Sequence, residues 1–223
     1  MDLHTFSIVA RCREKGSFGV AVSTARPSVG SLVPFVSLKG AIATQARVNT
    51  DLGRKGLTLL DAGIEIGIAL DLLLQADRDR DIRQIHGLDA RHVFAFTGEK
   101  CVEWAGHHIG KGYTVAGNML AGPQVIEAMA AAFEDAANLE LSERLVKALE
   151  AGQAAGGDKR GKQSAALLVA SPDPRYYHNL RVDDHADPVA ELRRIHDLVV
   201  EHSRQVEREY GPEGLRLFSR VKY

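Results

Sequence analysis

A threonine hydroxyl stands at the head of the first apolar segment of the chain, Thr5-Phe-Ser-Ile-Val-Ala10. A threonine at a free N-terminus can use its own α-amine as a base, because that amine has a pKa of about 7.7–8.0 and is partly unprotonated near neutral pH. Its hydroxyl can then attack a carbonyl carbon and cleave an amide bond. Met1 to His4 precede Thr5 here, so the amine exists only after the His4–Thr5 bond is cut. The alternative is structural, since threonine is favoured in strands.

Two further residues have the chemistry to complete such a site. Asp158 lies in the glycine-rich segment 156–161, and its carboxylate could hold an amine or hydroxyl through a charge-assisted hydrogen bond. Asn118 follows Gly117 at the end of a strand-like segment and could donate its side-chain amide to an oxyanion. A solvated loop at Asp158 and an ordinary Gly-Asn turn at Asn118 are the alternatives. We predict Thr5, Asp158 and Asn118 as catalytic residues.

Polar residues also emerge from an apolar segment just before a helix-like one, over residues 43–49. A helix start presents free N–H groups that suit carboxylates and oxyanions. The alternative is that Thr44 or Asn49 only terminates local structure. We predict five substrate-binding residues: Ser23, Thr44, Gln45, Arg47 and Asn49.

Charge and composition exclude several kinds of partner. The chain has 28 basic and 29 acidic residues, a net charge of −1, so no overall field favours nucleic acid or an anionic membrane. No stretch reaches the roughly 18 apolar residues that cross a bilayer, and the N-terminal residues do not resemble a secretion signal. We expect a soluble cytoplasmic protein that acts on a small molecule or a peptide. We also expect a homo-oligomer, because outer helices with apolar stripes often pair.

No metal and no cofactor is expected. Cys12 and Cys101 are isolated, and a reducing cytoplasm would keep them as thiols. His107 and His108 are adjacent on a strand-like segment and therefore point to opposite faces. We interpret His196 and His202, six residues apart on the last predicted helix, as surface residues.

Hydrophobic periodicity divides the 223 residues, interpreted as one domain, into strands and helices. Strands are predicted at 5–11, 18–22, 32–36, 41–44, 81–85, 92–96, 112–116 and 164–170, and near 176–184, with glycine turns at Gly87, Gly98 and Gly106–Gly110. Helices are predicted at 51–63, 64–76, 123–136 and 141–152, and from about 188 as a long amphipathic helix. Asp51 and Asp187 are the expected N-caps of the first and last helices. This order predicts an α+β fold, a four-layer αββα sandwich of two antiparallel sheets flanked by helices.

The order of the motifs resembles that of proteasome-type N-terminal-nucleophile (Ntn) hydrolases. A closer resemblance is to a bacterial family catalogued as domain of unknown function 1028 and placed in the Ntn-hydrolase superfamily. The segments that carry it span most of the chain: Thr5-Phe-Ser-Ile-Val-Ala-Arg11, Ala43-Thr-Gln-Ala46, Phe96-Thr-Gly98, Trp104-Ala-Gly-His107, Gly117-Asn118, Glu150-Ala-Gly-Gln-Ala-Ala-Gly-Gly-Asp158, Gln163-Ser-Ala-Ala166 and Val182-Asp-Asp-His185. The resemblance implies the αββα fold and Thr5 as nucleophile. It also implies that Asp158 matches the acidic residue in the aspartate-containing loop of proteasome-type enzymes. It implies no substrate.

Two departures from the proteasome-type pattern keep a second function open. That pattern has an aspartate after the second strand and a lysine on the third, where this chain has Ser23 or Thr24 and an apolar residue near Val33. A cation that would lower a neighbouring pKa is therefore missing from its expected place. The two hypotheses are an Ntn-type amidohydrolase and a non-catalytic ligand-binding or assembly protein that keeps the fold with a blocked N-terminus.

Overall fold

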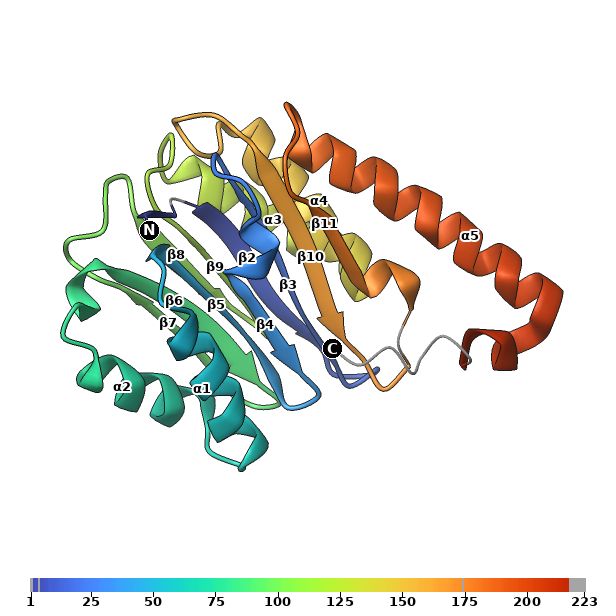
Figure 1. Ribbon diagram of the computed structural model, residues 1–223, viewed down its shortest axis with the longest axis horizontal. Helices are drawn as coiled ribbons and strands as arrows, with labels where there is room; N and C mark the ends of the chain where they lie inside the picture. The colour runs from blue at the N-terminus through green and yellow to red at the C-terminus, as the bar shows by residue number, and fades with distance from the viewer. Residues whose placement is uncertain (1, 4, 174, 217–223) are drawn as a thin grey trace.

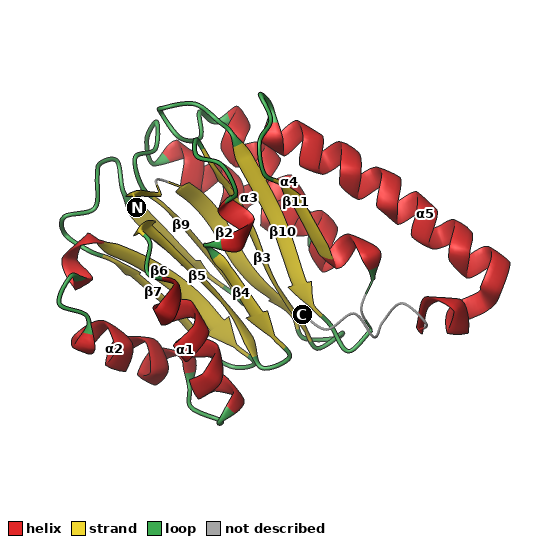
Figure 2. Cartoon of the chain, in the orientation of Figure 1, coloured by secondary structure: helices red, strands yellow, loops and turns green. Residues whose placement is uncertain are grey.

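Two antiparallel β-sheets lie face to face, and α-helices cover their outer faces (Figures 1 and 2). The computed structural model describes residues 2–3, 5–173 and 175–216. His4, the residue before the predicted nucleophile, lies outside the described residues. The predicted α+β class with two antiparallel sheets is confirmed.

The first sheet is built around β5 (Gly40–Arg47) and β6 (Arg83–Asp89), with β7 (Val93–Thr97) beside β6. Two short strands share the other side of β5: β4 (Pro34–Ser37) pairs with its first half, and β1 (Asp2–Leu3) pairs with Ala46 and Arg47. Pro34 begins β4, which among the described strands pairs only with β5, and this edge position suits proline because it has no N–H to donate to a second neighbour.

The second sheet has the order β11-β10-β3-β2-β9-β8. Its strands are β2 (Thr5–Cys12), β3 (Ser17–Thr24), β8 (Gly106–Gly110), β9 (Tyr113–Gly117), β10 (Ser164–Ala170) and β11 (Asn179–Val182). Thr5 pairs with Thr24, Thr24 pairs with Ser164, and Phe6 pairs with Gly117. The start of β2 therefore lies at the same end of the sheet as the ends of β3 and β9.

Five α-helices of the described residues form the outer layers. Helices α1 (Thr50–Asp61) and α2 (Ile66–Ala76) pack on the first sheet. Helices α3 (Gln124–Asp135), α4 (Leu141–Ala154) and α5 (Pro188–Arg216) pack on the second. Three short 3₁₀ turns lie at Val29–Ser31, Arg80–Ile82 and Tyr176–His178. No helix of this described part of the chain combines the length and apolar character needed to cross a bilayer.

Alternation along β2 decides what each layer of the core contains. Phe6, Ile8 and Ala10 face the helices and join the cluster with α3 and α4, whereas Val9 joins the apolar cluster between the sheets. Thr5 and Ser7 share the inward face with Val9, so the space between the sheets changes from apolar to polar toward the start of β2. This polar end contains the site described below.

Glycines account for two wrong turn predictions. Gly87 lies inside β6, and Gly106–Gly110 is strand β8. A Cβ on Gly106 would lie 2.6 Å from the Trp104 ring, and one on Gly110 would lie 2.0 Å from the Tyr113 ring. Gly106 and Gly110 therefore allow an aromatic ring to pack closely against the backbone of β8, and they do not form a turn.

Two helix starts and one strand start also test the predictions. Asn49, not Asp51, caps α1, because the Asn49 side chain accepts the Asp51 N–H at 3.1 Å. Helix α5 begins at Pro188 as predicted, and the Asp187 carboxylate accepts a hydrogen bond from the Ala190 backbone. The strand predicted at 81–85 begins later, at Arg83, because Arg80–Ile82 forms a 3₁₀ turn.

Candidate functional site

The three predicted catalytic residues lie at one end of the second sheet. The backbone N–H of Asn118 donates to the Thr5 carbonyl oxygen at 3.0 Å. Thr5 pairs with Thr24, and the next residue, Ala25, donates its N–H to Asp158 Oδ2 at 3.3 Å. Thr5 and Asn118 are fully buried, and Asp158 is 3% exposed.

The Asp158 carboxylate is surrounded by donors from its own loop and from β3. Oδ1 accepts the Arg160 backbone N–H at 2.9 Å and Arg160 Nε at 3.0 Å, while Oδ2 accepts Arg160 Nη2 at 2.6 Å and the Ala25 N–H. Four donors fill the lone-pair sites of a carboxylate. Asp158 thus fastens the glycine-rich loop to the end of β3.

Gln84 of β6 links the two sheets at this end. Its Oε1 accepts Gln45 Nε2 at 2.8 Å and Asn118 Nδ2 at 2.9 Å. Its Nε2 lies 2.9 Å from the Gly117 carbonyl oxygen, 3.0 Å from that of Gly106 and 2.9 Å from Thr97 Oγ1. Gln84, Gln45 and Asn118 are all fully buried, so the network holds the Asn118 amide in one position beside Thr5.

The network continues to a hydroxyl and an imidazole. Ser7 Oγ lies 2.6 Å from Gln45 Oε1 and 2.8 Å from His86 Nε2, and His86 Nδ1 lies 2.8 Å from Thr114 Oγ1. Each of these residues is fully buried. Burial, followed by the charge of nearby His107, lowers the pKa of His86 to about 3, so this imidazole is neutral at pH 7.

Two backbone carbonyls determine the direction of these hydrogen bonds. The Gly106 and Gly117 oxygens can only accept, so Gln84 must turn its nitrogen to them and its oxygen to Gln45. Gln45 must then turn its own oxygen to Ser7. The Ser7 hydroxyl has a single hydrogen, and it donates this hydrogen to Gln45 Oε1.

The same reasoning fixes the tautomer of His86. Because the Ser7 hydrogen goes to Gln45, Ser7 Oγ has to accept from His86, which therefore carries its proton on Nε2. The bare Nδ1 accepts from the Thr114 hydroxyl. His86 thus donates toward Ser7 and is not poised as its base.

The five predicted substrate-binding residues occupy different environments. Gln45 faces the other sheet and belongs to the network. Ser23 pairs with Phe6, on the helix side of the second sheet, and donates to the Ser164 carbonyl at 3.2 Å. Thr44 faces α1 and donates to the Asn49 carbonyl at 3.3 Å. Arg47 is exposed at the end of β5.

Asn49 has a structural role at the start of α1. Besides capping the helix, its side chain donates to Asp77 Oδ2 at 3.2 Å. The alternative considered for Thr44 and Asn49, that they terminate local structure, agrees with these contacts.

Sequence reasoning missed Ser7, Gln84, His86 and Thr114. Each is a polar residue in a buried strand, and each lies on the inward face of its strand. The available signal was a pair of polar residues at alternate positions, as at Thr5 and Ser7 and at Gln84 and His86. The local sequence pattern does not indicate which strands pair, so it could not predict that these residues lie together.

A cavity of about 470 Å³ lies at the opposite end of β10, between α5 and the start of α4. Glu140 in its wall accepts from the Tyr177 hydroxyl at 3.0 Å and contacts His178 Nε2 at 3.2 Å. Burial opposes ionisation of Glu140, yet these two hydrogen bonds hold its pKa below the usual value. The cavity is separate from the Thr5 end of the sheet.

The prediction that His196 lies on the surface is wrong. His196 is 2% exposed, because its face of α5 packs on α4, where Nε2 lies 3.1 Å from Ser142 Oγ. His202 is exposed, as predicted. Cys12 and Cys101 are both free thiols, as expected.

Fold and site together define an α+β protein whose two antiparallel sheets enclose a polar cluster at one end. The chain belongs to the family of unknown function DUF1028, whose family model matches residues 5–192. A crystal structure of the protein SPO2555 from Silicibacter pomeroyi, assigned to the same family, is similar to this chain. The two share 34% sequence identity with a TM-score of 0.81, over 92% of this chain and 91% of that one. No curated protein matches the chain.

Proposed function

We propose that this chain is an Ntn-type amidohydrolase, that its sheets and helices form an Ntn-hydrolase-like αββα sandwich, and that Thr5 is its nucleophile. The observation that carries the proposal is the position of Thr5. It begins the central strand β2, it receives a hydrogen bond from Asn118, and it lies at the same sheet end as Asp158.

The proposed reaction begins with cleavage of the His4–Thr5 bond, which frees the Thr5 α-amine. This amine takes the hydroxyl proton as Thr5 Oγ attacks the substrate carbonyl, and it then gives the proton to the leaving amine. The acyl group remains on Thr5 as an ester until water hydrolyses it. Asn118, held by Gln84, is the proposed oxyanion donor, because a pre-oriented amide stabilises charge without reorganising.

Asp158 is proposed to act as a positioning residue in this scheme. Its oxygens hold Ala25 and Arg160, so it sets the shape of the loop beside Thr5 and Thr24. We further propose a small molecule or peptide as substrate, a cytoplasmic location and a homo-oligomer. Size-exclusion chromatography with light scattering tests the oligomeric state.

The second candidate is a non-catalytic binding or assembly protein. Asp2–Leu3 pairs with β5 in one sheet, while Thr5 begins β2 in the other. This pairing of Asp2–Leu3 favours an N-terminal segment that stays in place. The cavity near Glu140 offers such a protein a ligand site away from Thr5.

Intact-mass measurement of the purified protein separates the two. The hydrolase predicts a species that begins at Thr5 and gains mass at Thr5 when treated with a β-lactone, which acylates nucleophilic hydroxyls. Thr5→Ala should abolish the labelling, and Thr24→Ala at the same sheet end is the matched control. Protein that retains residues 1–4, and labels no more than Thr5→Ala, would contradict the hydrolase and favour the binding protein.

A further inference from the structure

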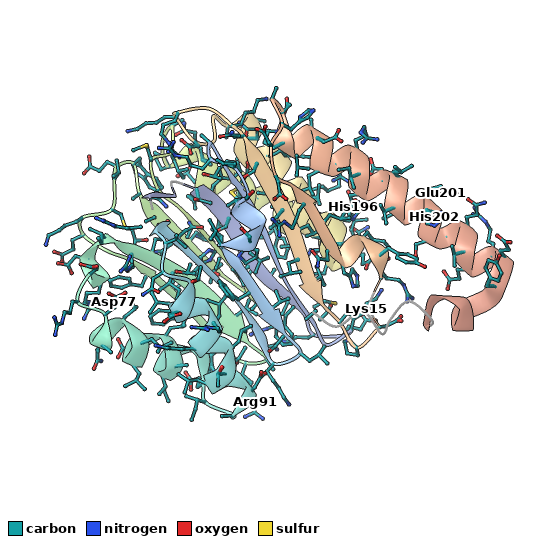
Figure 3. All side chains as sticks on the ribbon, in the orientation of Figure 1. Lys15, Asp77, Arg91, His196, Glu201 and His202 are labelled. Atoms are coloured by element: carbon teal, nitrogen blue, oxygen red, sulfur yellow. The ribbon has the colours of Figure 1, made fainter. Side chains whose placement is uncertain are left out.

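A group of potential metal ligands lies between α4 and α5, on the opposite side of the second sheet from the polar network. It consists of Glu143 Oε2 from α4 and of His196 Nδ1 and Asp197 Oδ1 from α5 (Figure 3 labels His196 on α5). Nδ1 lies 3.7 Å from the Glu143 oxygen and 3.6 Å from the Asp197 oxygen, and all three atoms lie within 4.8 Å of one another.

The His196 ring supplies an independent indication of a ligand. Its side chain is buried, its Nε2 contacts Ser142 Oγ at 3.1 Å, and its Nδ1 has no hydrogen-bond partner. A buried nitrogen without a partner is unfavourable. With the proton on Nε2, the Nδ1 lone pair faces two carboxylate oxygens and can ligate a cation held with them. With the proton on Nδ1, the N–H faces the same oxygens, which at 3.7 and 3.6 Å lie beyond hydrogen-bond distance.

The spacing suits a small divalent ion. Nitrogen and oxygen ligands lie about 2.0–2.1 Å from Zn²⁺, which places tetrahedral ligands roughly 3.4 Å apart. The 3.6 and 3.7 Å separations therefore need only a small contraction, and the third pair of ligands, Glu143 and Asp197, lies within 4.8 Å. One imidazole with two carboxylates suits Zn²⁺ and related transition ions, whereas Ca²⁺ and Mg²⁺ prefer oxygen ligands alone.

Arg193 provides the cation that faces this group in the structure. Its Nη1 lies 2.7 Å from Glu143 Oε2 and 3.1 Å from Asp197 Oδ1. Its Nε and Nη2 each lie 3.0 Å from a Glu150 oxygen. Arg193 can therefore release Glu143 and Asp197 while its two-bond pair with Glu150 stays intact. Lys147 is a second cation here, since its Nζ lies 3.9 Å from Glu143 Oε1. The carboxylates of Glu143, Glu150 and Asp197 still outnumber the two cations by one, and a divalent ion would compensate that charge.

We propose that Glu143, His196 and Asp197 bind a divalent transition-metal ion such as Zn²⁺, in exchange with the Nη1 group of Arg193. The bound ion fastens the C-terminal helix α5 to α4. The site is independent of Thr5 and of any hydrolase activity.

Titration calorimetry of the untagged full chain with ZnCl₂ tests the site. One ion per chain is expected, and His196→Ala should weaken binding roughly tenfold or more. His202→Ala removes an exposed histidine six residues along the same helix and should leave the affinity unchanged. Arg193→Gln removes the competing cation and should bind Zn²⁺ more tightly than the parent protein.

Glu143→Gln provides a second ligand variant, since Glu143 is only partly buried and its amide keeps the shape of the side chain. It should also lose affinity, and far-UV circular dichroism should show that its helix content is unchanged. The proposal is overturned if neither the parent protein nor Arg193→Gln binds Zn²⁺. It is equally overturned if His202→Ala loses as much affinity as His196→Ala.

Discussion

Ser7 Oγ lies 2.8 Å from His86 Nε2 between the two sheets, where both side chains are fully buried. A serine beside a histidine is the pair that many hydrolases use, with the imidazole as base. Here the Gly106 and Gly117 carbonyls orient Gln84 and Gln45, and Gln45 takes the Ser7 hydrogen. His86 must then donate to Ser7, so the pair joins the sheets and does not generate a nucleophile.

Ser7→Ala tests the importance of this joint. The change leaves Gln45 Oε1 and His86 Nε2 without their partner in a buried place, and unsatisfied polar groups of this kind cost about 1–3 kcal/mol. Urea unfolding should show that loss at pH 7. Ser31→Ala, at an exposed hydroxyl that bonds only to the nearby Ser28 carbonyl, should change stability by less than about 0.5 kcal/mol. Equal effects of the two substitutions would argue against a structural role for the network.

His86 should make folding stability depend on pH. Its pKa is about 3 in the folded protein and about 6.5 in an unfolded chain. Between these values the unfolded chain binds a proton that the folded protein does not, so the free energy of unfolding falls as the pH falls. The slope due to one such group reaches about 1.4 kcal/mol per pH unit.

Urea unfolding of the parent protein and of His86→Gln, at several pH values between about 4 and 7, measures this slope. The variant should be less stable at pH 7 but should lose less stability on acidification. Burial and the neighbouring His108 also lower the pKa of His107, which is present in both proteins, so the difference between the two curves reports His86. Parallel curves would contradict the assignment.

The sequence predicts the elements better than their contacts. Helix α4 was expected at 141–152 and spans Leu141–Ala154, because apolar spacing within one segment determines a helix. His196 was placed on the surface because only its own helix was considered, whereas its burial depends on Ser142 of α4.

The residues of the candidate site could likewise be predicted from the sequence only in part. Thr5, Asn118 and Asp158 could be selected because strand ends and loops are marked by composition. The contacts of Gln84 could not, since they join β5, β6 and the end of β9, which are distant in sequence. Strand pairing decides these contacts, and no local pattern encodes it.

Asp158→Asn should loosen the glycine-rich loop. An amide offers one oxygen where the carboxylate accepts four bonds, and its NH₂ group would face the donors of Arg160. Breaking this largely buried ion pair should lower stability by on the order of 3 kcal/mol. Trypsin should also cut faster after Lys159, Arg160 or Lys162. In contrast, Asp183→Asn disrupts an exposed pair with Arg181 and should lower stability by less than about 1 kcal/mol, with no change in loop cleavage.

Ala46→Gly should change the stability of the protein differently from Ala43→Gly, the same substitution three residues earlier in β5. Ala46 follows Gln45 and has a φ of 66°, a left-handed conformation that costs a residue with a Cβ about 1–2 kcal/mol. Glycine removes that strain, but it also makes the unfolded chain more flexible, at a cost of about 0.4–1 kcal/mol. Ala46 is also buried, at 3% exposed, and removing its methyl group costs about 0.8 kcal/mol, so the net effect should lie close to zero.

Ala43→Gly is the matched control, because Ala43 lies in the same strand and its methyl group packs between the sheets. It loses that packing and gains the flexibility, so it should destabilise the protein by about 1 kcal/mol or more. Thermal unfolding measures both, since 1 kcal/mol shifts the Tm of a chain of this size by about 2–4 °C. If both variants lower the Tm equally, the left-handed backbone conformation of Ala46 stores no strain.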